Sequence, residues 1–238
     1  MALDVLQTKA EILRSRARLE QRSLSCLGMQ VGKRTLWDRL RGVHPLHLGD
    51  ELKSWDVLRT AEFVEREFPN TARVLDIGSY SSEILCVLHR LGFVNLTGID
   101  QNPNLRAMPY GDTIHWEIGN FLRTPFPDRS FDVVTSISVI EHGFDAAALL
   151  GEMSRLLDHG GCFTASFDYW PHKLDTSDTQ FFGMDWRIFS RDEVNALVTA
   201  ANDYGLAPVG DLAFDAPEPA VHYAGRDYTF AWLVLRKR

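Results

Sequence analysis

Residues 74–83, which read VLDIGSYSSE, are the stretch from which the fold of the whole chain can be inferred. A short apolar run leads into an acidic residue and a glycine, which is typical of a buried strand that enters a tight turn at a nucleotide site. A dinucleotide fingerprint would have further glycines where this chain has Tyr80 and Ser82. Three interpretations follow: an altered dinucleotide site, a site for another nucleoside, or a strand and a turn without a ligand.

The residues after Thr71 predict an α/β fold. Short apolar runs alternate with helical patterns, which indicates βαβ units and a parallel sheet with helices on both faces. The last two apolar runs, residues 207–214 and 229–238, have no helix between them, so we expect them to pair antiparallel. The predicted fold is Rossmann-like: a mostly parallel seven-stranded sheet with an antiparallel last strand.

Before the sheet, the periodicity predicts two helices. The second begins at a candidate N-cap, Asp50, and stops before Pro69. We therefore divide the chain into an N-terminal helical extension or lid, residues 1–70, and a main domain, residues 71–238. The first helix is expected to bury four residues at helical spacing: Leu6, Ala10, Leu13 and Ala17.

Composition and charge limit the partners of the chain. A formal net charge of −7 over 238 residues argues against a general nucleic-acid or anionic-membrane binder, because both surfaces attract Lys and Arg. The three cysteines lack CxxC spacing, so neither a disulfide framework nor a zinc site is indicated. The N-terminus lacks a signal-peptide pattern, and the apolar run at 230–235 is too short to span a bilayer. We expect a cytoplasmic protein with a small-molecule partner and leave its oligomeric state open.

Two consecutive predicted strands end in acidic residues. Asp76 and Gly78 close the first strand, and Asp100 ends the second, where a carboxylate can accept hydrogen bonds from both hydroxyls of a ribose. Tyr80 and Ser82 would obstruct a pyrophosphate, so a nucleoside without a phosphate is favoured. S-adenosylmethionine is such a ligand, because it has a ribose and no phosphate.

From about residue 73 to 167 the sequence resembles the class I S-adenosylmethionine-dependent methyltransferases, in particular their small-molecule, type 11-like branch. VLDIG is similar to the family's first motif and LTGID to its acidic second motif. Residues 119–142 resemble the stretch from the adenine contact through the fourth strand, and residues 150–161 the helix and glycine turn before the fifth. The resemblance implies nine cofactor-binding residues: Asp76, Gly78, Ser79, Tyr80, Asp100, Gln101, Asn120, Phe121 and Ile137.

The resemblance assigns roles to some of these residues. Asp100 would hold the ribose, Asn120 and Phe121 would border the adenine, and Ile137 would lie beneath the cofactor. The family usually has glycine where this chain has Tyr80 and Ser82, and commonly an acid where it has Asn120. An amide oxygen can still accept a hydrogen bond from the adenine amine.

The segment at residues 168–189 is an insertion rich in aromatic and polar side chains. A loop of this length without a clear period is usually functional or disordered, and its aromatics argue against disorder. We expect this segment to line the acceptor pocket with seven side chains: Asp168, Tyr169, Trp170, His172, Phe181, Phe182 and Trp186. The alternative is an apolar plug packed beneath the N-terminal helices. A hydroxyl acceptor also needs a group that takes its proton. Three residues are candidates for this catalytic role: His142, Asp168 and His172.

The sequence therefore predicts an S-adenosylmethionine-dependent methyltransferase, with O-methylation of a sugar-like, polyol or natural-product acceptor as the expected reaction. One alternative is a non-catalytic S-adenosylmethionine-binding partner module, which the residues at 80 and 82 favour. A nicotinamide-dependent oxidoreductase is disfavoured by the missing GxGxxG. No metal site is expected, because the acids near Asp168 lack tight ligand spacing. The basic run at residues 33–42 is typical of a solvated helical face.

Overall fold

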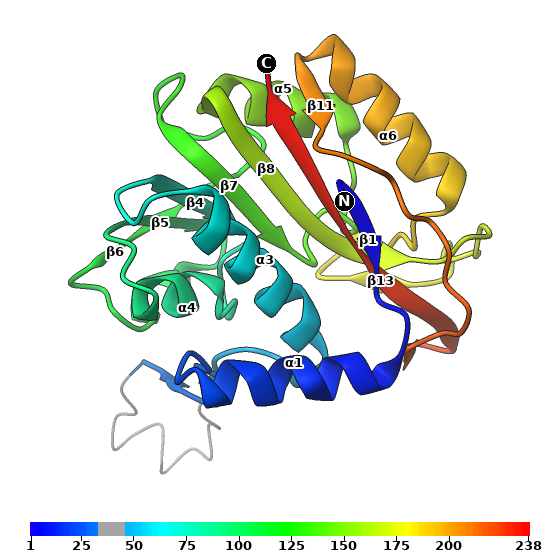
Figure 1. Cartoon of the computed structure of the whole chain (residues 1–238), viewed down its shortest axis with the longest axis horizontal. Helices are drawn as coiled ribbons and strands as arrows, with labels where there is room; N and C mark the ends of the chain where they lie inside the picture. The colour runs from blue at the N-terminus through cyan, green and yellow to red at the C-terminus, as the bar shows by residue number, and fades with distance from the viewer. Residues whose placement is uncertain (33–45) are drawn as a thin grey trace.

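The computed structural model describes residues 1–32 and 46–238, so the basic run at 33–42 lies outside the described residues. The centre of the molecule is a sheet of nine strands: β1 (Leu3–Val5), β4 (Arg73–Ile77), β5 (Asn95–Asp100), β6 (Ile114–Ile118), β7 (Phe131–Ile137), β8 (Leu157–Tyr169), β11 (Leu206–Pro208), β12 (Val221–Tyr223) and β13 (Arg226–Lys237). Seven of them lie in the order β1-β13-β8-β7-β4-β5-β6, and β11 and β12 pair with β13 outside this order (Figure 1).

The strand directions confirm the predicted fold class. Strands β4 to β8 pair parallel with one another, and β13 pairs antiparallel with β8. Strand β11 also pairs antiparallel with β13, as predicted for two apolar runs without a helix between them. Because β4, β5 and β7 are parallel, their carboxyl ends lie at one edge of the sheet, where open α/β sheets bind ligands.

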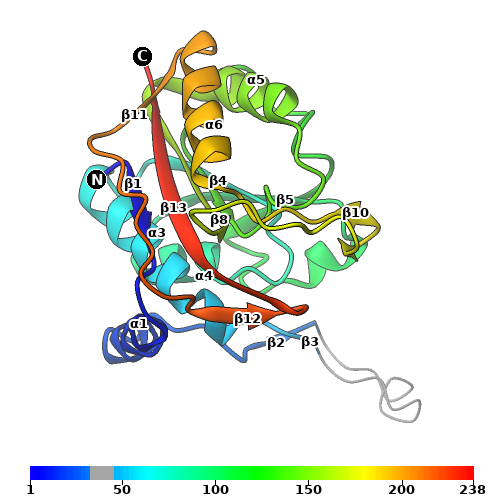
Figure 2. The same ribbon diagram turned by 90° about the vertical axis from the view of Figure 1, so that its right-hand side faces the viewer.

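Helices cover both faces of the sheet. In Figure 1 and Figure 2, α1, α3 and α4 lie on one side and α5 and α6 on the other. The helices are α1 (Lys9–Gln21), α3 (Ser54–Glu67), α4 (Ile84–Arg90), α5 (Ala146–Leu156) and α6 (Arg191–Asp203), with short 3-10 turns η1 (Glu51–Lys53) and η2 (Pro103–Ala107). Two small hairpins complete the described structure: β2 (Gln30–Val31) with β3 (Leu46–His47), and β9 (Gln180–Phe181) with β10 (Met184–Asp185).

Local sequence signals explain where two of these helices begin. The side chain of Asp50 accepts a hydrogen bond from the N–H of Leu52 at 2.9 Å and so caps the turn that leads into α3. Ser190 and Glu193 form a reciprocal capping box at the start of α6. The buried residues of α3 include Val57, Ala61 and Val64, which recur at helical spacing on one face.

The prediction for the first helix is wrong in its buried face. Leu13 is 57% exposed, whereas Ile12, Arg16 and Leu19 are buried. The spacing of apolar residues predicted the wrong face because a charged residue, Arg16, lies on the buried face. The residues before α1 form strand β1, which pairs with β13 through Leu3 and Leu233. The periodicity did not predict this strand.

Candidate functional site

The loop after β4 depends on one glycine. Gly78 has a φ of +68°, and a Cβ added there would lie 2.4 Å from Cγ2 of Val139, just after β7. Both the turn and the close approach therefore require glycine. Ser81 also has a positive φ, of 66°, but Tyr80 and Ser82 are absent from the positive-φ residues of the described chain. The loop thus closes without the glycines of a dinucleotide fingerprint.

Asp100 at the end of β5 holds this loop. Its Oδ2 accepts the backbone N–H of Tyr80 at 3.1 Å, and its Oδ1 accepts the N–H of Asn102 at 2.8 Å. Each carboxylate oxygen has two lone pairs, so each can also accept a hydrogen bond from a ligand hydroxyl. The acid and the glycine loop are therefore side by side, as the sequence predicted.

Asp76 lies inside the sheet rather than at its surface. Oγ1 of Thr135 on β7 donates to Oδ1 of Asp76 at 2.7 Å, and Oγ of Ser79 donates to the Asp76 carbonyl at 2.5 Å. Oδ2 of Asp76 is buried and has no hydrogen-bond partner in the part of the chain that the structure describes. Burial raises the pKa of this carboxyl to about 7. A cationic ligand group beside Oδ2 would supply the missing partner.

The other predicted cofactor residues lie around the same edge. Ile137 at the end of β7 and Phe121 are half-buried, and Gln101 and Asn120 are exposed. Oδ1 of Asn120 accepts the N–H of Leu122 at 2.9 Å, so this side chain caps its own turn. The contact of each residue with a ligand remains a prediction.

A buried ion pair attaches the N-terminal segment to the glycine loop. Nη1 of Arg16 on α1 lies 2.8 Å from Oε1 of Glu83, and these side chains are only 5% and 1% exposed. Nε of Arg16 donates to Oγ of Ser54 at the start of α3. The N–H of Gly49 donates to the carbonyl of Ser81 at 2.8 Å. The same contacts therefore fix both the loop and the beginning of α3.

Charged side chains gather at the carboxyl end of β8, on the face that α3 covers. Nζ of Lys53 lies 3.7 Å from Oδ1 of Asp168 and 3.7 Å from the centre of the Phe230 ring. Oγ of Ser166 donates to Oδ2 of Asp56 at 3.0 Å. We call this group the ionic cluster, and its members are Lys53, Asp56, Glu141 and Asp168.

The ionic cluster has unusual proton affinities. Burial raises the pKa of Asp56 to about 7 and raises that of Glu141 well above its ordinary value. Burial alone would lower the pKa of Lys53, but the carboxylates of Asp168 and Asp56 outweigh this effect and raise it. One oxygen each of Asp56 and Glu141 is buried without a hydrogen-bond partner among the described residues. Such groups are candidates for a functional site.

His142 lies beside the ionic cluster. Burial lowers the pKa of its imidazole, and the charge of Asp168 opposes that effect in part. Nδ1 of His142 is buried and makes no hydrogen bond within the described chain. The residue lines a crevice together with Phe121, the predicted adenine neighbour. The structure thus brings two predicted catalytic residues, His142 and Asp168, to one place beside the cofactor edge.

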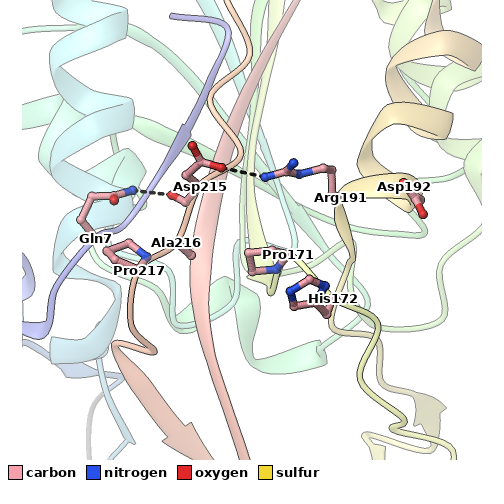
Figure 3. A pocket seen from close by; sticks show the side chains of 8 residues that line it. All are labelled: Gln7, Pro171, His172, Arg191, Asp192, Asp215, Ala216 and Pro217. Carbon is pink, nitrogen blue, oxygen red and sulfur yellow. Dashed lines mark hydrogen bonds and ion pairs between the residues drawn. The ribbon is translucent and has the colours of Figure 1, made fainter.

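His172, the third predicted catalytic residue, lies elsewhere. Its exposed side chain lines a surface cavity of about 560 Å³ with Gln7, Arg191 and Asp215 (Figure 3). Arg191 and Asp215 form an ion pair of 2.7 Å at this cavity. The side chain of Asp168 instead accepts a hydrogen bond from Nε1 of Trp186 in the buried interior. The structure therefore separates His172 from the other two candidates.

The expected acceptor contact is wrong for Tyr169. Its side chain is fully buried on the side of the sheet covered by α5 and α6, and its hydroxyl donates to the carbonyl of Phe214 at 2.7 Å. Tyr169 and Asp168 are adjacent in a strand, so they point to opposite faces. Trp186, in contrast, is buried against the ionic cluster through its hydrogen bond to Asp168.

Sequence reasoning missed several members of the site: Lys53, Asp56, Glu141 and Tyr228. Burial raises the pKa of Tyr228, and Asp168 adds to the shift. The only available signal was Glu141, which directly precedes His142 in the VIEH stretch. Nothing in the sequence indicated a functional role for Lys53 and Asp56, because they lie at the start of a helix, where polar residues usually serve as caps.

Known proteins resemble the region that forms this site. Residues 75–165 match a protein family described as "Methyltransferase domain". A demethylmenaquinone methyltransferase from Deinococcus radiodurans is 29% identical over 67% of this chain and 68% of the relative. A 27-O-demethylrifamycin SV methyltransferase from Amycolatopsis mediterranei is 28% identical over 53% of this chain and 41% of the relative.

A solved structure has the same fold. The geranyl diphosphate C-methyltransferase of Streptomyces coelicolor superposes with a TM-score of 0.58 at 16% identity, covering 97% of each chain. Residues 75–165 therefore form a class I S-adenosylmethionine-dependent methyltransferase domain, as the motifs predicted. The cofactor of this enzyme is S-adenosylmethionine. Its cationic amino and sulfonium groups and its ribose fit a site that offers Oδ2 of Asp76 and the carboxylate of Asp100.

Within residues 1–32 and 46–238, no helix is both long and apolar enough to cross a membrane. In the same part of the chain, no three His, Cys, Asp or Glu side chains are grouped in a way that could hold a metal ion.

Replacing Gly78 by alanine should destabilise the fold more than an equivalent change at Gly205. Gly205 has a φ of +72°, similar to that of Gly78, but an added Cβ there would meet nothing within 4 Å. Gly205→Ala should cost about 1–2 kcal/mol from backbone strain alone. Gly78→Ala should cost a further 1–3 kcal/mol, roughly, from overlap with Val139. Urea unfolding of both variants measures the difference, and equal losses would show that the loop can move away from Val139.

Asp56→Asn should change how stability depends on pH. The folded-state pKa of Asp56 is raised to about 7, so the stability that its protonation contributes is present below pH 4 and is lost as the pH rises through 7. The amide keeps the hydrogen bond from Ser166 and carries no charge. We expect Asp56→Asn to raise the free energy of unfolding between pH 5 and pH 8 relative to wild type by about 1–3 kcal/mol. A parallel pH dependence in both proteins would contradict this.

Proposed function

We propose that this enzyme methylates a hydroxyl group of a small molecule, with His142 as the group that accepts the hydroxyl proton. The observation that carries the proposal is the position of His142 between the cofactor edge and the ionic cluster. Its buried Nδ1 has no partner in the described structure. A proton acceptor with free hydrogen-bonding capacity at that place is what a hydroxyl acceptor needs.

The chain's own residues would contribute position and proton transfer. Bound S-adenosylmethionine supplies an electrophilic methyl group on a sulfonium. Asp100 and the loop at Gly78 would hold it, and α3 would keep water from the acceptor side. His142 is neutral near pH 7 because burial lowers its pKa, so it can take the proton at Nδ1. The nearby charge of Asp168 would stabilise the imidazolium that results.

The acceptor would be a hydroxylated natural product, sugar-like molecule or polyol. The buried oxygens of Asp56 and Glu141 that lack partners in the described chain can accept hydrogen bonds from further hydroxyl groups. The relative from Amycolatopsis is named for methylation at oxygen, while the enzyme from Streptomyces coelicolor is named for methylation at carbon. The presence of a candidate proton acceptor favours oxygen for this chain.

The remaining assignments follow the same proposal. We place the enzyme in the cytoplasm, where its three buried free cysteines would remain reduced. Residues 1–70 would act as a lid over residues 71–238, with the insertion at 168–189 beside the acceptor. We expect no nucleic-acid or membrane partner, given the net charge of −7.

A test of the reaction is the formation of S-adenosylhomocysteine in the presence of hydroxylated aromatic compounds and sugars, with each methylated product identified by mass spectrometry. Methylated oxygen in a product supports the proposal. Tight binding of S-adenosylmethionine without turnover on the whole panel would favour a non-catalytic binding module. Methylation at carbon or nitrogen alone would remove the role given to His142.

His142→Gln should lower kcat by about 10²–10⁴-fold while leaving the affinity for S-adenosylhomocysteine unchanged. In the wild type, kcat should hold through the pH range in which a free histidine becomes protonated and fall only at lower pH, because burial lowers the pKa of the His142 imidazole below its ordinary value. The matched control is His115→Gln, since His115 is exposed on β6. A His142→Gln enzyme with the wild-type pH profile would assign the proton transfer to another group.

A further inference from the structure

The hairpin formed by β9 and β10 has a strained, exposed aromatic residue at its tip. Phe181 pairs with Met184, which leaves Phe182 and Gly183 as a two-residue turn with φ values of +57° and +75°. Such a turn favours Asn-Gly or Gly-Gly, because a bulky side chain is rare at positive φ. The Phe182 side chain is nevertheless 87% exposed, so burial in this molecule does not offset the strain. Backbone strain of this kind is typical of functional positions.

The hairpin is held directly over the proposed site. The N–H of Gly143 donates to the carbonyl of Asp185 at 2.9 Å, and the N–H of Arg187 donates to the carbonyl of Glu141 at 2.9 Å. An added Cβ at Gly143 would lie 3.2 Å from Sδ of Met184, which shows how closely the hairpin packs there. These contacts fix the tip beside His142.

An aromatic path connects the tip to the ionic cluster. The rings of Phe182 and His142 meet edge to face, with centroids 5.7 Å apart. Phe181 lies 5.9 Å from His142 and 5.2 Å from Trp186. Trp186 in turn lies 5.7 Å from Tyr228, next to the ionic cluster. The path is exposed at one end and buried at the other, as expected for the wall of a binding site rather than for a closed core.

We propose that Phe182 determines acceptor specificity by packing against an aromatic ring of the acceptor. This inference rests on the proposed function, because it places the acceptor hydroxyl at His142. The Phe182 ring is exposed and lies beside the His142 imidazole, so a planar aromatic acceptor whose hydroxyl reaches His142 can pack against this ring. A polyol offers no such surface. The position of Phe182 therefore narrows the proposed range of acceptors to hydroxylated natural products that carry a phenol or a fused aromatic alcohol, in preference to sugar-like molecules and polyols.

The fold offers a matched control for this residue. Strand β12 joins β13 through Ala224 and Gly225, a two-residue turn with φ values of +46° and +71°. Phe182→Asn and Ala224→Asn both introduce Asn-Gly into the same kind of turn, so both should raise the melting temperature. Only Phe182→Asn removes an aromatic ring.

The test is calorimetric titration of 2-naphthol into the full-length protein saturated with S-adenosylhomocysteine. We expect wild type and Ala224→Asn to bind 2-naphthol equally and Phe182→Asn to bind at least about fivefold more weakly, as for the loss of an aromatic pair. Phe182→Leu, which keeps an apolar side chain, should also lose affinity.

Two results would overturn the proposal: equal binding by Phe182→Asn and wild type, or no binding of 2-naphthol by wild type. Equal binding together with a loss of self-association in light scattering would also assign the ring to contacts between copies of the chain. Failure of the proposed function is a separate result, because it would appear as the absence of an O-methylated product in the turnover assay, whereas this titration measures only the binding of 2-naphthol.

Discussion

The buried ion pair between Arg16 and Glu83 is the contact on which the rest of the site depends. Removing two charges from water is costly, and breaking such a pair on one side typically destabilises a protein by about 3–5 kcal/mol. Arg16 also donates to the hydroxyls of Ser25 and Ser54. One guanidinium therefore joins α1, the segment after it, the start of α3 and the cofactor loop.

This arrangement has a consequence for the acceptor side. Ser54 directly follows Lys53 and lies two residues before Asp56, so the position of Arg16 also sets where the ionic cluster begins. Glu83 directly precedes α4, which continues from the glycine loop. The cofactor half and the proposed acceptor half of the site are thus held by the same pair of charges. The N-terminal segment is an integral part of the site because it carries one of those charges and two members of the ionic cluster.

The fold and the cofactor edge could be predicted from sequence because both depend on local patterns. The strand ending in Asp76, the turn at Gly78 and the acid at Asp100 have a characteristic spacing, and the alternation of strands and helices sets the parallel sheet. Strand β1 was missed because three residues are too few to show a period. The buried face of α1 was missed because Arg16 occupies it, and an inward charge cannot be recognised before its partner is known.

The acceptor side could not be predicted in the same way. Lys53, Glu141 and Asp168 come from three elements far apart in sequence, and only the folded sheet brings them together. The sequence grouped Asp168 with His172 because they are close in the chain, yet the chain leaves β8 between them and His172 reaches a different surface. Proximity in sequence predicted a shared role, but the chain leaves the strand after Tyr169 and carries His172 away from Asp168.

The most direct measurement of the central claim is the affinity of the full-length protein for S-adenosylhomocysteine, by calorimetry, in wild type, Asp100→Ala and Asp112→Ala. Asp112 is an exposed acid in the turn before β6 and serves as the control. We expect wild type and the control to bind S-adenosylhomocysteine equally. Asp100→Ala should bind it more weakly by about 1–3 kcal/mol, the usual effect of losing hydrogen bonds to a charged group. Unchanged affinity in a folded Asp100→Ala protein would contradict the assignment of this edge as the cofactor site.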